Sequence, residues 1–447
     1  MRVPGWRIVV IWMLAGLLPA AASSAGETAA DGAWPQWRGP LATGEAPQAD
    51  PPVTWSETDN VRWKIAIPGN GSATPIVWGD HVFVTTAVPV GDSGTRDGLF
   101  TRLTRRFVGT ESASQTLQYT LLAVDRRTGA VAWERVVREA APHAGKHQTG
   151  SWAAPSALTD GEVLCAFFGS AGLYCFDMNG GPLWDRDFGD MEIRMGFGEG
   201  ASPTLHGDTV IVNWDHQEQS FIAALDKRTG VERWRTERDE MTSWATPLVV
   251  EYGGRTQVVT NATYRVRSYD FESGELLWDG EGATTNAIPS PVAADGIVYL
   301  MSGYSGNRLD AVRLADAAGD ITGGTAVAWS LDRDTPYVPS PLLHDGILYF
   351  TKGNNGILSA YDARSGQTLY GPERLSGIRS LYASPVAAGG RIYIPSRDGT
   401  TAVVAAGSTF ELLAVNMLGD GFDASPAAVD GELYLRGRQH LYCIAAD

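Results

Sequence analysis

The feature that most constrains the fold of this chain is a short motif that recurs eight times along its 447 residues. Each copy has small residues, a proline, roughly four further residues, a glycine and then alternating apolar residues. Alternation is the period of a β-strand and glycine supplies the positive φ of a hairpin turn, so each copy predicts two paired strands. The motif prolines, most of them 41–50 residues apart, are Pro75, Pro155, Pro203, Pro247, Pro291, Pro341, Pro385 and Pro426.

A second motif follows the better copies and predicts two more strands. An apolar run ends in aspartate, a Thr-Gly or Ser-Gly turn follows, and the next run carries an aromatic residue, as in Asp125, Thr128 and Trp133. We expect the aspartate to bond the turn backbone and the aromatic ring to dock on the neighbouring repeat instead of stacking on a cofactor. The residues predicted to dock in this way are Trp63, Trp133, Trp184, Trp234, Trp278, Trp329 and Tyr370.

Four strands in about 44 residues, repeated eight times, predict an all-β, eight-bladed β-propeller of four-stranded antiparallel blades. The last copy ends after three strands, while an unpartnered apolar strand with a tryptophan precedes the first copy. Placing residues 53–68 as the outer strand of the last blade closes the ring and removes exposed sheet edges. We therefore predict one domain over 53–447, with an insertion in the first blade at 89–118 and an N-terminal extension at 26–52.

Residues 1–25 predict a cleaved export signal. Arg2 and Arg7 accompany the apolar run Ile8–Leu18, which is too short to cross a bilayer, and small residues follow it. We expect a periplasmic or secreted mature chain with no transmembrane segment, the alternative being an uncleaved anchor. Because no cysteine precedes Cys165, a lipid anchor is not expected.

The charge of the chain disfavours nucleic acid as a partner. The sequence has 51 acidic and 35 basic residues, a formal net charge of −16. A phosphate-binding surface needs clustered basic residues, and the largest cluster here is the short set at 102–106. Gly-x-Ser-x-Gly and zinc-spaced His/Cys sets are also absent, so the sequence does not support hydrolytic chemistry.

With these repeats, the chain resembles the PQQ-binding-like β-propeller family over about residues 34–447. The resemblance rests on the Ala-Ser-Pro copies, the Asp-x-x-Thr-Gly turns, the tryptophan eight residues after aspartate, and the opening Trp-Pro-Gln-Trp-Arg-Gly-Pro at 34–40. It implies an eight-bladed fold in a family that includes quinoprotein dehydrogenases and the partner-holding lipoprotein BamB. The dehydrogenases are expected to carry adjacent cysteines and the lipoprotein an N-terminal lipidated cysteine, and this sequence has neither.

The sequence therefore predicts an exported, monomeric, non-catalytic binding or scaffold protein with no resident cofactor or metal. Its partner is expected to be a protein, a peptide or an envelope polymer. The alternative implied by the resemblance is an oxidoreductase that carries pyrroloquinoline quinone (PQQ) and calcium over the channel mouth. An unassigned activity, such as glycan degradation, also stays open.

The predicted binding surface is the loop face, which carries the loops that enter the first strand of each blade and join its second and third strands. The long segments 89–118, 140–150 and 190–200 belong to this face, whereas the turns of the opposite face are tight. The residues predicted to line the channel mouth are Asn70, His147, Trp152, Glu199, Trp244, Asn286, Tyr337, Tyr382 and Asp423. Such side chains suit a flat or polar ligand, the alternative being that they only fill the channel.

Two metal hypotheses accompany this site. His143 and His147 have the spacing of a helical metal pair, but the surrounding proline and glycine favour a loop with solvated histidines. Glu199, Asn286 and Asp423 carry the oxygen ligands that calcium prefers, although they come from three different blades.

The three cysteines are predicted to be buried and inert, as cysteines in strands usually are. Cys165 and Cys175 fall on adjacent strands of one hairpin, and Cys443 in a distant blade. A Cys165–Cys175 disulfide is the alternative in an oxidising compartment.

Overall fold

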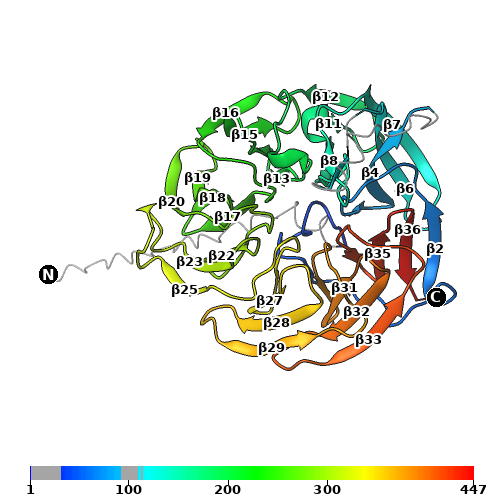
Figure 1. Ribbon diagram of the computed structural model, residues 1–447. Coiled ribbons are helices and arrows are strands. Elements are labelled where there is room, and N and C mark those ends of the chain that lie inside the picture. The colour runs from blue at the N-terminus through cyan, green and yellow to red at the C-terminus, as the bar shows by residue number, and fades with distance from the viewer. Residues whose placement is uncertain (2–31, 92–108, 112–113, 447) are drawn as a thin grey trace.

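The computed structural model describes residues 32–91, 109–111 and 114–446, together with Met1. These residues form eight twisted β-sheets arranged as blades around a central channel (Figure 1). The prediction of an all-β, eight-bladed propeller is confirmed. The predicted export signal at 1–25 and most of the insertion at 89–118 lie outside the described residues.

The blades follow one another in sequence order, and each has its first strand at the channel and its fourth at the rim. Blade one consists of β3 (Ile76–Trp78), β4 (His81–Pro89), β6 (Leu117–Asp125) and β7 (Val131–Ala140), and blade two of β9 (Leu158–Thr159), β10 (Leu164–Phe167), β11 (Leu173–Phe176) and β12 (Pro182–Arg186). Blade three consists of β13 (Thr204–His206), β14 (Thr209–Trp214), β15 (Ser220–Asp226) and β16 (Glu232–Arg238), and blade four of β17 (Leu248–Tyr252), β18 (Arg255–Thr260), β19 (Arg265–Asp270) and β20 (Leu276–Glu281). Blade five consists of β21 (Val292–Ala294), β22 (Ile297–Ser302), β23 (Arg308–Arg313) and β25 (Val327–Leu331), and blade six of β26 (Leu342–His344), β27 (Ile347–Thr351), β28 (Ile357–Asp362) and β29 (Thr368–Arg374). Blade seven consists of β30 (Val386–Ala388), β31 (Arg391–Pro395), β32 (Thr400–Ala405) and β33 (Leu412–Met417), and blade eight of β34 (Ala427–Val429), β35 (Glu432–Arg436), β36 (His440–Ala445) and β2 (Val61–Ala66).

Short elements supplement the blades. β1 (Glu45–Ala46) adds to β30 in parallel, β24 (Gly319–Asp320) adds to β20, and β5 (Thr110–Glu111) pairs with β8 (Lys146–His147). The helical elements of the described part of the chain are two single-turn 3₁₀ helices, Gly169–Ala171 and Arg194–Gly196. Within the described ranges, no helix has the length and apolar character needed to cross a membrane.

The turn between the third and fourth strands is held by the aspartate of the second motif. In blade one, Asp125 Oδ1 accepts the Thr128 N–H at 2.8 Å and the Thr128 hydroxyl at 2.5 Å. Gly129 then takes a φ of 75°, a conformation that a residue with a Cβ adopts only with strain. Asp226, Asp270 and Asp362 make the same pair of bonds in blades three, four and six.

The outer-strand tryptophan of one blade packs on this turn in the next blade. Trp63 of blade eight lies against Gly129 of blade one, where an added Cβ would come within 2.8 Å of the indole. Its Nε1 donates to the carbonyl of Arg126 at 2.9 Å. Equivalent contacts join Trp184 with Gly230, Trp234 with Gly274 and Trp329 with Gly366. The glycine thus serves two purposes, since it permits the turn and admits the ring.

The remaining predicted docking residues make different contacts. Trp133 lies against Gly180, and Tyr370 packs edge-on against Phe410 with ring centroids 5.7 Å apart. Trp278 is 1% exposed, and its Nε1 bonds Gln257 Oε1 of its own blade at 3.1 Å. Blade five has a longer connection, including β24, in place of the tight turn, so no equivalent carbonyl faces this indole.

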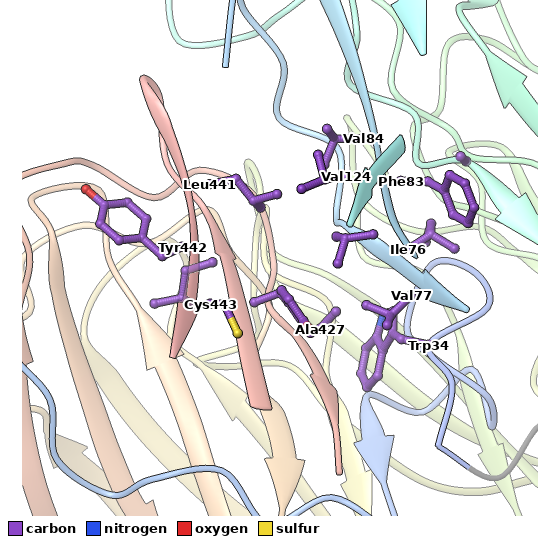
Figure 2. Close-up of a cluster of buried hydrophobic side chains, with 14 of the residues drawn as sticks. Trp34, Ile76, Val77, Phe83, Val84, Val124, Ala427, Leu441, Tyr442 and Cys443 are labelled. Carbon is purple, nitrogen blue, oxygen red and sulfur yellow. The ribbon is translucent and has the colours of Figure 1, made fainter. Parts of the chain in front are cut away.

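The ring closes in blade eight, where β2 pairs antiparallel with β36 and Trp63 lies opposite Cys443. This confirms that an N-terminal strand completes the last blade. Figure 2 shows the core of the seam, in which Ile76 and Phe83 of blade one belong to the same buried cluster as Ala427 and Leu441 of blade eight. Apolar burial therefore holds the two ends of the chain together.

The hydroxyl residues of the first motif link neighbouring blades. In seven of the interfaces the backbone N–H of one blade donates to a hydroxyl of the next at 2.8–3.1 Å. The chain of donors and acceptors runs Thr74, Ser156, Ser202, Thr246, Ser290, Ser340, Ser384 and Ser425. This series of hydrogen bonds is interrupted at the seam between blades eight and one, because Thr74 Oγ1 has no partner among the described residues.

Residues 33–50, for which the sequence predicted only an extension, enter the channel from the turn face, and we call them the channel plug. In Figure 1 the dark-blue chain lies at the centre of the ring. Its bonds reach six blades, through Trp34 with Val77, Pro35 with Thr159, Gln36 with Leu205, Trp37 with Ser290, and Arg38 with Pro341 and Pro385. The plug then leaves along β30 and passes over blade seven to β2.

Arg38 is the deepest charge of the plug. It is 1% exposed, and its guanidinium donates to the backbone carbonyls of Thr43, Pro341 and Pro385 at 2.7–3.1 Å. Burial lowers the pKa of Arg38 to about 9, so the group still carries its charge at pH 7. Gly44 lies directly against the guanidinium, and a side chain there would displace it.

Candidate functional site

The centre of the loop face contains a cavity of about 400 Å³, which we call the central cavity. Trp37, at the tip of the channel plug, closes it from the channel side, and its Nε1 bonds Ser290 Oγ at 3.0 Å. The rings around the cavity are those of Trp37, His147, Phe197, Trp244, Tyr304, Tyr337 and Tyr382. The hydroxyl groups among its lining residues include those of Ser72, Thr149, Ser202, Ser290, Ser340 and Ser425.

Most of the predicted mouth residues meet at this cavity. His147, Glu199, Trp244, Tyr337, Tyr382 and Asp423 line it. Asn70 and Trp152 line two adjoining hollows, and Asn286 is buried beside Tyr337. The sequence did not identify Trp37, Phe197 and Tyr304 as lining residues, although Trp37 stands in the opening motif and Tyr304 in a loop of the correct face.

Aromatic stacking shapes one wall. Tyr304 and Tyr337 stack with ring centroids 4.8 Å apart at 28°. On the next blade, the Arg397 guanidinium lies 4.0 Å from the centre of the Tyr382 ring, and the Thr149 hydroxyl donates to the Tyr382 oxygen at 3.2 Å. Rings held in this way offer flat apolar surface with polar groups at the edges.

Trp244, which also lines the cavity, is held in place by its backbone and its indole. Its N–H donates to the Ala287 carbonyl at 2.8 Å, and Nε1 donates to the Gly198 carbonyl at 2.7 Å. One face of the ring also covers Gly200. These bonds join three successive loops of the loop face, so the indole orientation depends on all of them.

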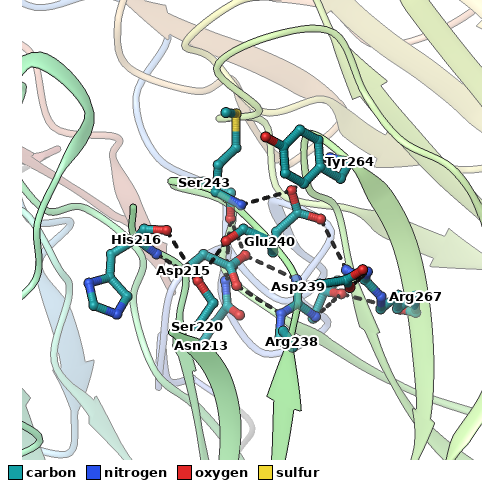
Figure 3. Close-up of polar contacts among 12 residues, drawn as sticks. Asn213, Asp215, His216, Ser220, Arg238, Asp239, Glu240, Ser243, Tyr264 and Arg267 are labelled. Carbon is teal, nitrogen blue, oxygen red and sulfur yellow. Dashed lines mark hydrogen bonds and ion pairs between the residues drawn. The ribbon is translucent and has the colours of Figure 1, made fainter. Parts of the chain in front are cut away.

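A buried polar network anchors the loop that precedes Trp244 (Figure 3). Arg238 donates to both oxygens of Asp215, at 2.8 and 3.0 Å, and neither side chain is exposed. Ser243 donates to Asp215 at 2.6 Å. Glu240 accepts bonds from Arg267 and from backbone N–H groups. Since every charge here has a partner, the network positions Trp244 without offering a free reactive group.

Glu199 lies between the central cavity and a side hollow of about 250 Å³ that His143 and Trp152 also line. Its carboxyl accepts the Ser170 N–H at 2.7 Å and the Ser170 hydroxyl at 2.5 Å. Burial raises the pKa of Glu199 to about 7, against the opposing effect of the Ser170 bonds. Gly169 makes room for the carboxylate, because a Cβ at that position would collide with it.

Asp423 and His147 are both engaged with neighbouring groups. Asp423 accepts Arg397 Nε at 2.6 Å and Arg438 Nε at 2.9 Å. His147 Nδ1 lies 2.6 Å from the Thr149 hydroxyl, and burial, then Arg397 and Lys146, lower the pKa of its ring. His147 is therefore neutral at pH 7.

The two metal hypotheses find no support in this arrangement. His143 pairs with Asp190 at 3.2 Å in the side hollow, whereas His147 lines the central cavity. Glu199 and Asp423 are already bonded to Ser170 and to arginines. Around the cavity the described residues thus present no set of free carboxylates suited to a quinone-bound calcium. Among the described residues, the group of ligand-type side chains that does come together is Glu45, His344 and Asp345, on the turn face.

The cysteines differ in part from the expectation of three inert thiols. Cys165 and Cys175 stand directly opposite each other in β10 and β11 and form a disulfide, with Cα atoms 4.1 Å apart. Both are buried inside blade two, so the bridge does not border the central cavity. Cys443 is a buried thiol whose pKa burial raises to about 12, which makes it unreactive at neutral pH.

Comparison with known proteins shows the family to which this chain belongs. Residues 50–196 and 118–371 match the family described as outer membrane protein assembly factor BamB. The chain belongs to this family of PQQ-like β-propellers. The structure of BamB from Moraxella catarrhalis is similar, with a TM-score of 0.56 and 15% identity over 85% of this chain and 98% of that one.

Other solved structures share the BamB-like fold. A quinohemoprotein alcohol dehydrogenase from Pseudomonas putida aligns with a TM-score of 0.54 and 12% identity, over 92% of this chain and 80% of that one. A computationally designed protein, Ika8, aligns with a TM-score of 0.50 and 14% identity, over 74% of this chain and 92% of that one. No curated protein sequence matches the chain. At these identities the structural likeness shows the fold alone.

Proposed function

We propose that this BamB-family propeller is an exported scaffold that holds a segment of a partner protein in the central cavity. The observation that carries the proposal is an aromatic cavity on a rigid ring, open on the loop face and closed by Trp37 on the channel side. Asp423 is paired with two arginines and Glu199 is held by Ser170, an arrangement that supports binding over catalysis.

The lining favours an extended segment that carries an apolar or aromatic side chain. A volume of about 400 Å³ accommodates one or two such side chains among Trp244, Tyr304 and Tyr337. Hydroxyl groups at the cavity wall, such as those of Ser72 and Thr149, can bond the peptide backbone. An envelope polymer is the alternative occupant, and the test below distinguishes the two.

Three lines of support favour an envelope location. The sequence predicts an export signal, and the family to which the chain belongs is described as an outer membrane assembly factor. A disulfide inside blade two also suits an oxidising compartment. We therefore propose that the mature protein acts as a monomer in the periplasm or outside the cell.

The test is capture of partners from an envelope extract by the wild-type protein and by a Trp244→Ala/Tyr337→Ala variant. We expect the wild type to retain a protease-sensitive partner and the variant to lose it by at least about tenfold, as for truncated aromatic hot spots. Tyr264→Ala is the matched control, because Tyr264 is an exposed ring outside the cavity. Equal retention by the double variant contradicts the proposal, and a protease-resistant ligand favours the polymer.

The oxidoreductase alternative remains a prediction with its own test. Purified protein is titrated with PQQ and calcium, and its absorbance and dye reduction with alcohols or sugars are followed. A saturable spectral change with dye reduction supports the alternative. Absence of both removes it.

A further inference from the structure

A second hollow on the loop face contains a buried cation without an acceptor. Arg436, the last residue of β35, is 1% exposed, and its Nε, Nη1 and Nη2 atoms have no hydrogen-bond partner among the residues that the structure describes. It lines a hollow of about 280 Å³, which we call the arginine hollow, with Asn70, Arg397, Asp423 and Arg438. The hollow adjoins the central cavity, and both are lined by Ser72, Thr149, Gly150 and Asp423.

The acidic groups nearest to Arg436 are already engaged. Asp423 accepts bonds from Arg397 and Arg438, at 2.6 and 2.9 Å. Asp420 accepts the backbone N–H groups of Arg438, Gln439 and His440 at 2.9–3.0 Å. Three guanidinium groups therefore accompany two carboxylates, which leaves an excess of one positive charge among the described groups around this hollow.

Arg436 nevertheless keeps its charge. Burial lowers the pKa of Arg436 to about 10, against the opposing effect of Asp420, so the guanidinium stays protonated at pH 7. A buried charge without a partner is costly, and buried charges in folded proteins are normally paired. Water can fill hydrogen-bond positions but supplies no opposite charge. A planar guanidinium fork fits two oxygens of one anionic group.

We propose that the arginine hollow binds a small oxyanion, a carboxylate, phosphate or sulfate group, whose oxygens accept the hydrogen bonds that Arg436 lacks. Arg397 and Arg438 add positive potential while their shared partner Asp423 keeps them in place. Asn70 and Gln148 lie at the exposed rim and provide neutral donors to the same group. This site shares part of its lining with the proposed peptide site, but it rests on Arg436 and does not depend on peptide binding.

The test is calorimetric titration of the full chain with inorganic phosphate and with acetate, at constant ionic strength. We expect saturable binding by the wild type and a loss of affinity of roughly tenfold to a hundredfold in Arg436→Met, the range for hydrogen bonds to charged groups. Arg308→Met is the matched control, because the Arg308 guanidinium on the same face is already paired with Asp310 and Glu281. Equal binding by the wild type and Arg436→Met, or no binding by the wild type, overturns the proposal.

Two further measurements complete the experiment. Should Arg436→Met fail to fold, phosphorus NMR of phosphate with the wild type provides the readout. Line broadening that acetate relieves supports the site, and its absence overturns it. To separate a free ion from a group carried on a chain, acetylated trialanine with a free carboxylate is compared with its amide. Binding of phosphate indicates a free ion, whereas binding of the free-acid peptide alone indicates a chain-borne carboxylate.

Discussion

Glu199 illustrates how a single residue in this propeller is determined by its neighbours. Its carboxyl occupies space that exists because Gly169 has no side chain, and Ser170 supplies two donors. The bonds hold the group in place, yet burial dominates and favours the neutral form. Glu199 therefore adds a pH-dependent penalty to the stability of a structure whose other cavity charges are paired.

Replacing Glu199 by glutamine should remove this pH dependence. The folded pKa of about 7 exceeds the usual value of 4.5, so the folded state binds more protons between these values and stability falls as pH rises through this window. At about 1.4 kcal/mol per pKa unit, the wild type loses about 3 kcal/mol relative to Glu199→Gln, with no further loss above pH 7. Urea unfolding from pH 4 to 8 measures the difference, with exposed Glu275→Gln as control. Parallel curves for Glu199→Gln and the wild type would refute this account.

The linked hydroxyl groups near the channel are the contacts that recur most regularly from one blade interface to the next. Each hydroxyl satisfies a backbone N–H of the preceding blade, so a serine in one blade stabilises the edge of its neighbour. At the rim, tryptophan on glycine fulfils the equivalent role. Where both contacts are present, as between blades five and six, adjacent blades are fastened by polar bonds inside and aromatic packing outside.

Ser340→Ala should weaken the interface between blades five and six. The substitution leaves the Ser290 N–H buried without an acceptor, a loss of about 1–3 kcal/mol in the free energy of unfolding. Ser290 also holds Trp37, so the fluorescence of the cavity base should shift in the same variant. Exposed Ser408→Ala is the control. A stability equal to that of the wild type would show that water replaces the hydroxyl.

The sequence predicted those features that are local and repeated. Alternating apolar runs and Asp-x-x-Thr-Gly turns identify the blades. Because the last copy lacks a fourth strand, the sequence also predicted that the strand with Trp63 completes it, and in the structure Trp63 lies opposite Cys443. The sequence did not predict the channel plug, because this segment carries no repeat motif. Its residues Trp34, Gln36 and Arg38 bond to blades that are distant in sequence. Asn286 was placed at the mouth by its position before a proline, yet its side chain is buried behind the wall.

At the scale of the whole molecule, the seam between blades eight and one differs from the other interfaces. The hydroxyl bond is missing there, and closure depends on β2, the buried cluster of Figure 2 and the pairing of Arg126 with Glu432 at 2.6 Å. The strand that seals this interface is also the continuation of the channel plug. Closure of the ring and filling of the channel therefore depend on one continuous segment of the chain.

Deleting residues 61–66 should abolish cooperative folding. The deletion exposes the edge of β36 and removes Trp63 from Gly129, leaving an unpaired strand that invites association. Thermal melting by circular dichroism and size-exclusion chromatography measure the outcome, with Lys64→Ala, an exposed substitution in the same strand, as control. A soluble deletion variant that melts cooperatively would contradict the role of β2 in closure.

The channel plug also makes the central cavity depend on completion of the whole ring. Trp37 precedes the first blade in the chain, whereas Asp423 and Ser425, which border the same cavity, belong to the last blade. A folding chain with fewer than eight blades therefore has a cavity that lacks a wall. A ligand that requires that wall would be held only after the ring has closed, so binding would report complete folding.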